Sequence, residues 1–524
     1  MVRVASQSLP SGRVTGNRRG RPCCRHSRFG LCGGRAAVLL LCLFCTGCTS
    51  WRDYLRNGFK VGPNYAPPPA PVAEHWIDAT DVRVREESQT PCLWWKVFRD
   101  PVLDGLVSQV SQQNLTLRQA GFRILQARAQ RGVIRGNLFP QQQDASGAFR
   151  RLGTGGEFFD QWDWGFSLAW ELDFWGRFRR AVRAADANLD ASIEDYDDAL
   201  VTLLADAADS YVAIRTNEER IRLLQQNIAI QQAILTVGED RLGAGRITSV
   251  DVEQVRSNLL QNEAQVEQLQ INVRLAANRL CILMGDPPQD LQEQLGTGAI
   301  PTAPAEVAVG IPADLLRRRP DVRRAERQAA AQAEQIGIAT SELYPAITIN
   351  GTLGYQAGDF SDLFSSAAFA GSVGPSFRWN LLNYGRLRNN IRLEDARFQE
   401  AIAVYQQTAL SAGAEVENGL ITFLRAQRRA RLLNDSAAAA GTAVQAIREQ
   451  LRVGAIDFNQ YAVIQQNLIT QQDLWAQSRG EIALGLIQVY RALGGGWEIR
   501  LQQEPAPDEL PPPEEIPLPA EESP

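Results

Sequence analysis

The feature that most constrains this chain is an internal duplication of a unit of about 200 residues. Leu138-Phe139-Pro140 recurs as Leu343-Tyr344-Pro345, at an offset of 205 residues, and Trp175-Gly176-Arg177 recurs as Tyr384-Gly385-Arg386, at an offset of 209. The offset changes by four residues between these motifs, where a loop can absorb an insertion. The sequence therefore predicts two similar structural units, with a leader, a linker and a tail outside them.

The first unit contains a stretch of strict alternation, Gln161–Arg177, whose even positions are apolar from Trp162 to Phe174. A period of two predicts a strand with one apolar and one polar face. Its length suits a tilted membrane strand, which needs ~9–11 residues and turns its apolar side chains toward lipid. The alternation alone is also compatible with a half-buried strand of a soluble sheet.

The second unit repeats the alternation, beginning at Ile347 and Ile349. The strand residues expected to face lipid are Trp162, Trp164, Phe166, Leu168, Trp170, Leu172, Ile347, Ile349, Phe377, Trp379 and Leu381. The first strand of the first unit, Gln141–Arg151, is less regular, because Gln142 and Asp144 fall where the second unit has isoleucines. Either a bulge shifts its register, or this end lies outside the membrane.

Long helices are predicted after each strand pair. Residues 177–237 contain no glycine and no proline, and a helix of that length would extend about 90 Å at ~1.5 Å per residue. A turn is predicted over 238–248, followed by apolar residues in a 4–3 alternation from Val255 to Leu280. The same alternation returns from Ile464 to Val489, so each unit should end in an antiparallel coiled-coil hairpin. The second long helix is predicted to be less uniform, because it contains three glycines.

The N-terminus has a basic segment, an apolar run at Ala36–Phe44 and a cysteine at Cys48. It is too short to span as a mature helix and resembles a bacterial lipoprotein signal, although Cys45 stands where such signals usually have leucine. The resemblance implies lipidation, as by palmitate, of Cys48. The predicted divisions are a signal peptide (1–47), a lipid anchor with a proline-rich segment (48–100), a first repeat (101–285), a linker (286–312), a second repeat (313–496) and an acidic, proline-rich disordered tail (497–524).

Composition argues against several classes of function. The net charge is −5 and residues 1–48 contain eight arginines and no acid, so no basic patch for nucleic acid remains in the rest. The only histidines are His26 and His75, and the chain has no phosphate-binding loop, nucleophile motif or metal-ligand cluster. We therefore expect no enzyme activity, no cofactor and no metal. Pairing of Cys92 with Cys281 is left open.

Four membrane strands are too few for one chain. An open sheet edge in lipid leaves backbone groups without partners, and the smallest membrane barrels have about eight strands. Several copies must therefore share a barrel, and three copies would supply twelve strands.

The sequence resembles the outer-membrane efflux proteins, the TolC-like channels of tripartite export systems, in their lipoprotein branch. The residues that carry this resemblance are Val61-Gly62-Pro63-Asn64-Tyr65, Trp94-Trp95, 170–177 (WELDFWGR), 317–322 (RRRPDV) and 490–497 (YRALGGGW). It implies a mostly helical fold with a pair of membrane β-hairpins. Three copies would form a twelve-stranded barrel in outer-membrane lipid that continues into a twelve-helix coiled-coil tunnel in the periplasm. The implied partners are two further copies, a periplasmic adaptor and a proton-driven inner-membrane transporter, and the channel would conduct small molecules passively.

The turns of the helical hairpins are the expected adaptor contacts. Their residues are Leu242, Gly243, Ala244, Gly245, Leu451, Val453, Gly454 and Ala455. The glycines also have a structural interpretation, since glycine ends helices where φ must become positive. Members of the family often carry an aspartate that constricts the entrance after the second turn, but this chain has Ile464-Gln465-Gln466 there. Asp251 and Glu253, after the first turn, are the alternative entrance acids.

Two further functions stay open at this point. The same architecture serves type I-like protein secretion, and the sequence does not separate secretion from drug or metal efflux. A coiled-coil envelope lipoprotein without a pore would explain the helices and Cys48 but not the alternating strands.

Overall fold

The computed structural model describes residues 51–85, 92–452 and 457–503. The chain divides into two compact units, one ending at Arg56 and the other beginning at Asn57. The described part of the first unit contains α2 (Trp51–Arg56), and all other elements belong to the second. The predicted signal peptide and Cys48 lie outside the described residues.

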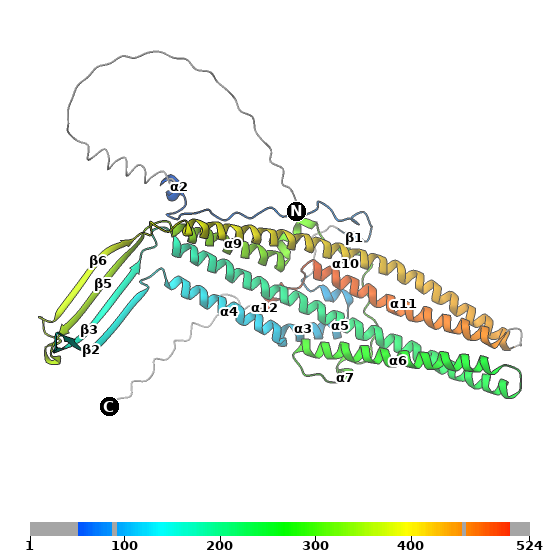
Figure 1. Cartoon of the computed structure of the whole chain (residues 1–524). Coiled ribbons are helices and arrows are strands. Elements are labelled where there is room, and N and C mark those ends of the chain that lie inside the picture. Colours follow the sequence, from blue (N-terminus) through cyan, green and yellow to red (C-terminus); the bar gives the residue numbers. More distant parts are fainter. Residues whose placement is uncertain (1–50, 86–91, 453–456, 504–524) are drawn as a thin grey trace, which may run out of the picture. The chain divides into compact units, whose positions relative to one another are not determined.

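Both copies of the repeat form the same succession of helix, strand, strand, long helix and returning helix (Figure 1). In the first copy the elements are α3 (Pro101–Gln113), α4 (Leu115–Gly136), β2 (Gln142–Thr154), β3 (Glu157–Glu171), α5 (Arg177–Gly243) and α6 (Ser249–Met284). In the second they are α8 (Leu315–Arg318), α9 (Pro320–Ser341), β5 (Ala346–Ala357), β6 (Phe369–Arg378), α10 (Arg386–Arg452) and α11 (Phe458–Ala492).

Shorter elements lie around and between the repeats. They are β1 (Val84–Arg85), η1 (Trp94–Phe98), α7 (Gln292–Leu295), β4 (Val307–Ala308), η2 (Pro312–Asp314), η3 (Phe360–Asp362) and α12 (Ile499–Gln503). β1 and β4 pair in parallel, so the linker predicted over 286–312 is tied to the segment that precedes the first repeat.

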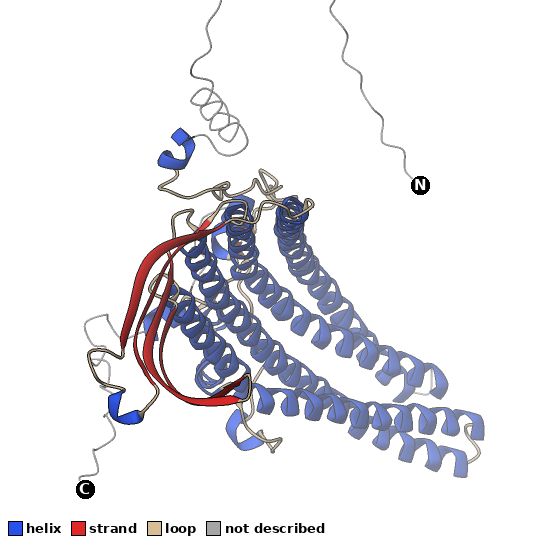
Figure 2. Cartoon of the chain, turned by 60° about the vertical axis from the view of Figure 1, so that its left-hand side comes forward, coloured by secondary structure: helices blue, strands red, loops and turns tan. Residues whose placement is uncertain are grey.

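The four long strands form one antiparallel sheet in the order β2-β3-β5-β6. Figure 2 shows that this sheet is curved, and Figure 1 shows it at one end of the long helices, opposite the α5–α6 turn. β2 and β6 are the outer strands, and neither has a second partner in the described chain. The sheet is therefore open at both edges.

The two long helices are continuous and equal in length, with 67 residues in α5 and 67 in α10. At ~1.5 Å per residue each extends about 100 Å. The glycines inside α10 do not interrupt the helix. At least one of them is needed for close packing. A Cβ on Gly419 would lie 3.1 Å from the backbone nitrogen of Val489 in α11, so the missing side chain lets the two helices approach closely.

The two predicted coiled-coil seams differ. In α6 the seam is mostly buried against α5, as at Val255, Leu259 and Leu269. In α11 the predicted residues Leu468 and Trp475 are only half-buried. α11 packs against α5 as well as α10, so a second face of this helix is buried, including Tyr461, Gln465 and Ile469. The seam prediction is thus incomplete for the second copy.

The main core lies midway along the helices, where η1 and α3 cover α5 and α11. Trp94 is fully buried, and its ring stacks on Tyr490 with the centroids 5.6 Å apart. Nearer the sheet, Arg180 of α5 is also fully buried. Its guanidinium donates to the Val61 carbonyl (2.7 Å), the Gly62 carbonyl (2.9 Å) and the Glu334 carboxylate (2.6 Å), so it joins the segment before β1, α5 and α9.

Candidate functional site: the sheet and the helical turns

The strand register places most of the apolar side chains of the four strands on one face, while Leu152 and Phe159, an opposite pair near the β2–β3 turn, lie on the other. Phe149 lies opposite Trp162, Trp164 opposite Tyr355, and Ile347 opposite Phe377. Directly opposite residues of antiparallel strands share a face. Neighbouring rings are in contact, with centroid separations of 4.6 Å for Phe149 and Trp162 and 6.1 Å for Trp164 and Tyr355.

Apart from that pair, the other face of the sheet is polar and hydrogen-bonded. Asn350 donates to the Ser376 hydroxyl (2.8 Å), and the hydroxyls of Thr352 and Ser372 are 2.9 Å apart. Arg150 and Asp163 form an ion pair of 3.5 Å across the first two strands. The sheet therefore has one mainly apolar and one mainly polar face, as the alternation predicted. Contact of the apolar face with lipid stays a prediction.

Not all residues expected to face lipid belong to the strands. Trp162, Trp164, Phe166, Leu168, Trp170, Ile347, Ile349 and Phe377 lie on the apolar face of β3, β5 and β6. Trp379 and Leu381 lie beyond the end of β6, so their placement in a strand was wrong. Leu172 follows β3 directly, and its N–H still donates to the Ile347 carbonyl (2.8 Å).

Short segments, 172–176 and 379–385, lead from the strands into the long helices and are held by side-chain hydrogen bonds. The Asp173 carboxylate accepts hydrogen bonds from the backbone N–H groups of Phe178 (2.9 Å) and Arg179 (3.0 Å), which caps α5 and turns the chain out of the sheet. In the second copy the Trp379 indole donates to the Leu343 carbonyl (2.9 Å), which holds this residue against the turn before β5.

The irregular pattern of the first strand has a simple cause. β2 pairs with β3 without a bulge from Gln142 to Thr154, so the bulge considered for this strand is absent from that pairing. Instead, Gln141 stands between Pro140 and the strand, whereas Ala346 begins β5 directly after Pro345. The Gln141 amide donates to the Glu171 carbonyl (3.2 Å) and accepts from the Glu171 N–H (2.7 Å), in the manner of a backbone pair. The odd residues of β2 thereby join the apolar face.

The first helical turn begins later than predicted. α5 continues through Gly238, which sits against the ring of Phe458 in α11, where a Cβ would lie 2.8 Å from the ring. Leu242 and Gly243 are still helical, and the turn consists of 244–248, with Gly245 at φ 68°. Gly238 is thus a packing residue, and Gly245 is the residue that turns the chain.

The second turn is only partly described. Leu451 lies near the end of α10, and Val453, Gly454 and Ala455 lie outside the described residues. Phe458, at the start of α11, is almost fully buried against Val255 and Ala462, with Leu451 packed beside them. This cluster joins the two helical hairpins near their ends. No local pattern marked Phe458 as a core residue, because its partners Val255 and Gly238 lie about 200 residues away along the chain.

The two candidate entrance acids already have partners. Asp251 forms a capping box with Thr248 at the start of α6, and this hydrogen bonding lowers the pKa of the Asp251 carboxyl. Glu253 forms an ion pair with Arg256 (2.7 Å), which also contacts Glu239 (2.9 Å). Their role at an entrance stays a prediction.

Amide side chains occupy the place where related channels carry an acid. Gln466 accepts hydrogen bonds from Gln231 (3.2 Å) and Asn262 (3.1 Å), and Asn262 also donates to Gln231 (2.9 Å). Two helical turns further on, Arg220 of α5 pairs with Asp473 of α11 at 2.7 and 2.9 Å. Both sets of contacts join the first helical hairpin to α11.

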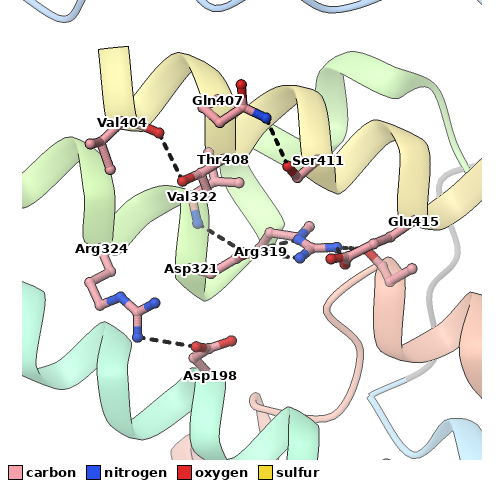
Figure 3. A network of polar contacts seen from close by, with 11 residues as sticks. Asp198, Arg319, Asp321, Val322, Arg324, Val404, Gln407, Thr408, Ser411 and Glu415 are labelled. Atoms are coloured by element: carbon pink, nitrogen blue, oxygen red, sulfur yellow. Dashed lines mark hydrogen bonds and ion pairs between the residues drawn. The ribbon is translucent and has the colours of Figure 1, made fainter. Parts of the chain in front are cut away.

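A third polar cluster, which we call the Arg319 clasp, consists of Arg319, Asp321, Glu415 and the Ala492 carbonyl. Figure 3 shows its three side chains. Arg319 donates to both oxygens of Asp321 (2.9 and 2.7 Å), to Glu415 (2.6 Å) and to the carbonyl (2.9 Å). Burial opposes the charged form, but these hydrogen bonds outweigh it and raise the Arg319 pKa. The clasp joins α9, α10 and the end of α11.

No group of metal-ligating side chains occurs within residues 51–85, 92–452 and 457–503. In the same ranges, no helix is both long enough and apolar enough to cross a membrane. Cys92 and Cys281 are not joined by a disulfide in this structure.

Comparisons with known proteins agree with this architecture. The profile of a family described as outer membrane efflux protein matches residues 106–286 and 311–495, one segment for each copy of the repeat. The pyoverdine export outer membrane protein OpmQ of Pseudomonas putida is 30% identical over 420 residues, which cover 77% of this chain and 88% of OpmQ. Nodulation protein T of Rhizobium leguminosarum bv. trifolii is 29% identical over 456 residues, covering 86% and 97%.

Among solved structures, the outer-membrane channel OprN is 34% identical and matches with a TM-score of 0.79, covering 84% of this chain and 99% of OprN. The Campylobacter jejuni CmeC outer membrane channel, at 22% identity and a TM-score of 0.77, has the same fold. The chain therefore belongs to the outer membrane efflux protein family and acts as an outer-membrane channel of an efflux system.

Proposed function

We propose that three copies of this chain close one twelve-stranded barrel and conduct small molecules passively through it. The observation that carries the proposal is the open sheet, which has unpaired outer strands β2 and β6 and one apolar face. In lipid, such edges are stable only when another strand pairs with them. A four-stranded sheet also lies below the size of known membrane barrels, whereas three sheets together lie well within it.

In this arrangement the polar face lines the channel, and α5, α6, α10 and α11 of each copy continue it into the periplasm. The family and its relatives support an efflux role, and OpmQ is named for pyoverdine export. A proton-driven inner-membrane transporter would then select the substrate and supply the energy for transport. The lipidated Cys48 would add an anchor to the same membrane.

The helical turns are the proposed docking surface for a periplasmic adaptor. The first comprises Leu242, Gly243, Ala244 and Gly245, which lie farthest from the sheet (Figure 1). Gly243, Ala244 and Gly245 are exposed and small, so a partner helix can approach the backbone closely. Three copies would present six turns in a ring, and weak contacts with each would add through avidity.

The assembly is tested by extracting the full-length protein from outer membranes in mild detergent and measuring its mass. We expect a trimer whose mobility changes on heating. A monomer or dimer as the largest species would contradict the proposal.

The docking surface is tested by Ala244→Glu and Ala455→Glu, with Gln261→Glu at an exposed position further along α6 as the control. We expect the two variants at the turns to form trimers but to lose export in cells that contain the adaptor and pump. The control should export normally. Normal export by both variants would place the docking surface elsewhere.

A further inference from the structure

A cavity of about 530 Å³ lies where the sheet meets the long helices, between the segments that lead into α5 and α10 and the turn before β5. The strand residues that line it are Glu171, Ala346 and Arg378. They share the polar face of the sheet with Thr348 and Ser376, whose hydroxyls are 2.7 Å apart. In the proposed barrel this face lines the channel, so the cavity lies on the path of a solute.

The two acids that the first repeat contributes to this cavity are paired within the chain. Glu171 forms an ion pair with Arg177 at 3.2 Å. Asp173 caps α5 and forms an ion pair with Arg179 at 2.8 Å. Each carboxylate has a cation beside it, which reduces its field in the rest of the cavity.

The second repeat contributes two arginines to the same cavity, Arg378 at the end of β6 and Arg386 at the start of α10. Within the described residues, neither guanidinium forms an ion pair or a hydrogen bond. A third acid, Glu342, also lines the cavity and is exposed. Two unpaired arginines against one unpaired glutamate leave the cavity with an excess of positive charge.

The comparison of the repeats shows why these arginines are unpaired. At an offset of 209 residues, Asn380 and Leu382 stand where the first repeat has Glu171 and Asp173. α10 also has no acid in its first turn. The N-terminus of a long helix carries a partial positive charge, and here it adds to the charge of Arg386, the first residue of α10.

We infer that this cavity binds the carboxylate of a small organic anion, with Arg378 and Arg386 as its hydrogen-bond donors. A guanidinium donates two parallel hydrogen bonds to a carboxylate, and the volume is typical of small-molecule sites. Leu172, Tyr344 and Leu387 also line the cavity and offer apolar surface to the organic part of the ligand. The inference rests on the proposed function, because the anion reaches the polar face through the channel. Both arginines are exposed, so the bound anion can leave again.

The first test measures the reactivity of individual arginines in the full-length protein, extracted in a non-ionic detergent at low ionic strength. Phenylglyoxal modifies exposed arginines, and peptide mass spectrometry reports the extent of reaction at each one. We expect benzoate to protect Arg378 and Arg386, whereas Arg392, an exposed arginine further along α10, reacts as before. Benzamide resembles benzoate in shape but has no charge, and it should protect none of the three.

The second test measures binding of radiolabelled benzoate by equilibrium dialysis. Arg378→Gln and Arg386→Gln should each weaken binding on the order of tenfold, because a charge-assisted hydrogen bond is lost. Arg392→Gln is the matched control and should leave binding unchanged. Glu342→Gln removes the opposing carboxylate and should strengthen binding, an effect that a merely structural role of this residue does not predict.

The outcomes separate this inference from the proposed function. Equal protection by benzamide and benzoate overturns the inference, and so does unchanged binding in both glutamine variants of Arg378 and Arg386. Because the cavity lies within one chain, binding is measurable whether or not trimers form. A trimer without protection at either arginine overturns the site alone, whereas binding by a protein that forms no trimer supports the site and contradicts the proposed barrel.

Discussion

Asn114 and Arg319 occupy equivalent places in the two repeats and perform the same task by different chemistry. The Asn114 amide donates to the Leu283 carbonyl (2.7 Å), and Arg319 donates to the equivalent carbonyl of Ala492 (2.9 Å). Asn114 also caps α4 through the Leu117 N–H (3.0 Å), whereas Arg319 binds two carboxylates. Both close the junction between a short helix and the end of a returning helix.

The backbone around these residues is nearly unchanged between the repeats. Gly285 and Gly494 follow the two carbonyls with φ 83° and 71°, and a Cβ on either would press on the backbone at the end of the short helix, at Gln113 or at Arg318 and Arg319. The side-chain partners differ because Asp206, the equivalent of Glu415, is paired with Arg279 (2.9 Å) and Arg491 (3.5 Å) instead. The duplication thus preserved a geometry and left its chemistry free to diverge.

The largest difference between the repeats should appear when each junction residue is removed. Arg319→Ala leaves Asp321 and Glu415 without their shared cation, and breaking a largely buried pair costs about 3–5 kcal/mol. Asn114→Ala loses a helix cap, which costs about 0.5–2 kcal/mol, together with one buried hydrogen bond. Thermal denaturation of the detergent-extracted trimer should show a larger loss of apparent Tm for Arg319→Ala. Equal losses would mean that the clasp acts only as a cap.

The membrane strands should instead behave alike in the two repeats. Leu168→Arg and Phe377→Arg place a charge on the apolar face, which costs about 2–4 kcal/mol at the bilayer midplane. Ser167→Arg, next to Leu168 on the polar face, is the control and should assemble. The amount of trimer in outer membranes measures the effect. Ordinary assembly of Leu168→Arg and Phe377→Arg would show that this face does not contact lipid.

Replacing a helical glycine with alanine should change the stability in opposite directions in the two repeats. Gly238→Ala, in the first repeat, pushes a methyl group against Phe458, and such overpacking costs about 1–3 kcal/mol. Gly441→Ala, in the second repeat, meets Leu468 only at an ordinary contact distance of 3.9 Å and should gain up to about 1 kcal/mol from helix propensity. Apparent Tm values of the two variants check the signs. Stabilisation by Gly238→Ala would contradict the packing role of that glycine.

The smallest expected effect is a pH dependence confined to the first repeat. Burial raises the pKa of Glu194 from 4.5 to about 7 against the opposing charge of Arg323, 2.5 Å away, and the second repeat has Ala403 at the equivalent place. Because the folded state holds the proton more tightly, this group contributes its full stability below pH 4.5 and loses it as the pH rises through about 7. Glu194→Gln should reduce the fall of the apparent Tm between these pH values without abolishing it, because burial also raises the pKa of Asp209 to about 7. An unchanged slope would show that Glu194 does not contribute to it.

Sequence patterns were sufficient wherever the signal was local. The alternation in β3, the long helix of the first repeat and the order of elements in both repeats follow from periods of two and about 3.6 and from the absence of glycine and proline. The duplication added a constraint that no single segment carries, since each repeat could be checked against the other. The open sheet also followed from the sequence, because two hairpins supply only four strands.

Tertiary contacts decided the rest. Gly238 looked like the end of a helix, but its place against Phe458, 220 residues away, makes it a packing residue. The ends of the strands depend on Asp173, whose carboxylate caps the next helix, and on Trp379, whose indole binds the turn before β5. The register of β2 depends on one inserted residue, Gln141, that replaces a backbone pair with its side chain. Periodicity records which side chains avoid water, whereas these features depend on which particular groups meet, and that is fixed only when distant segments pack together.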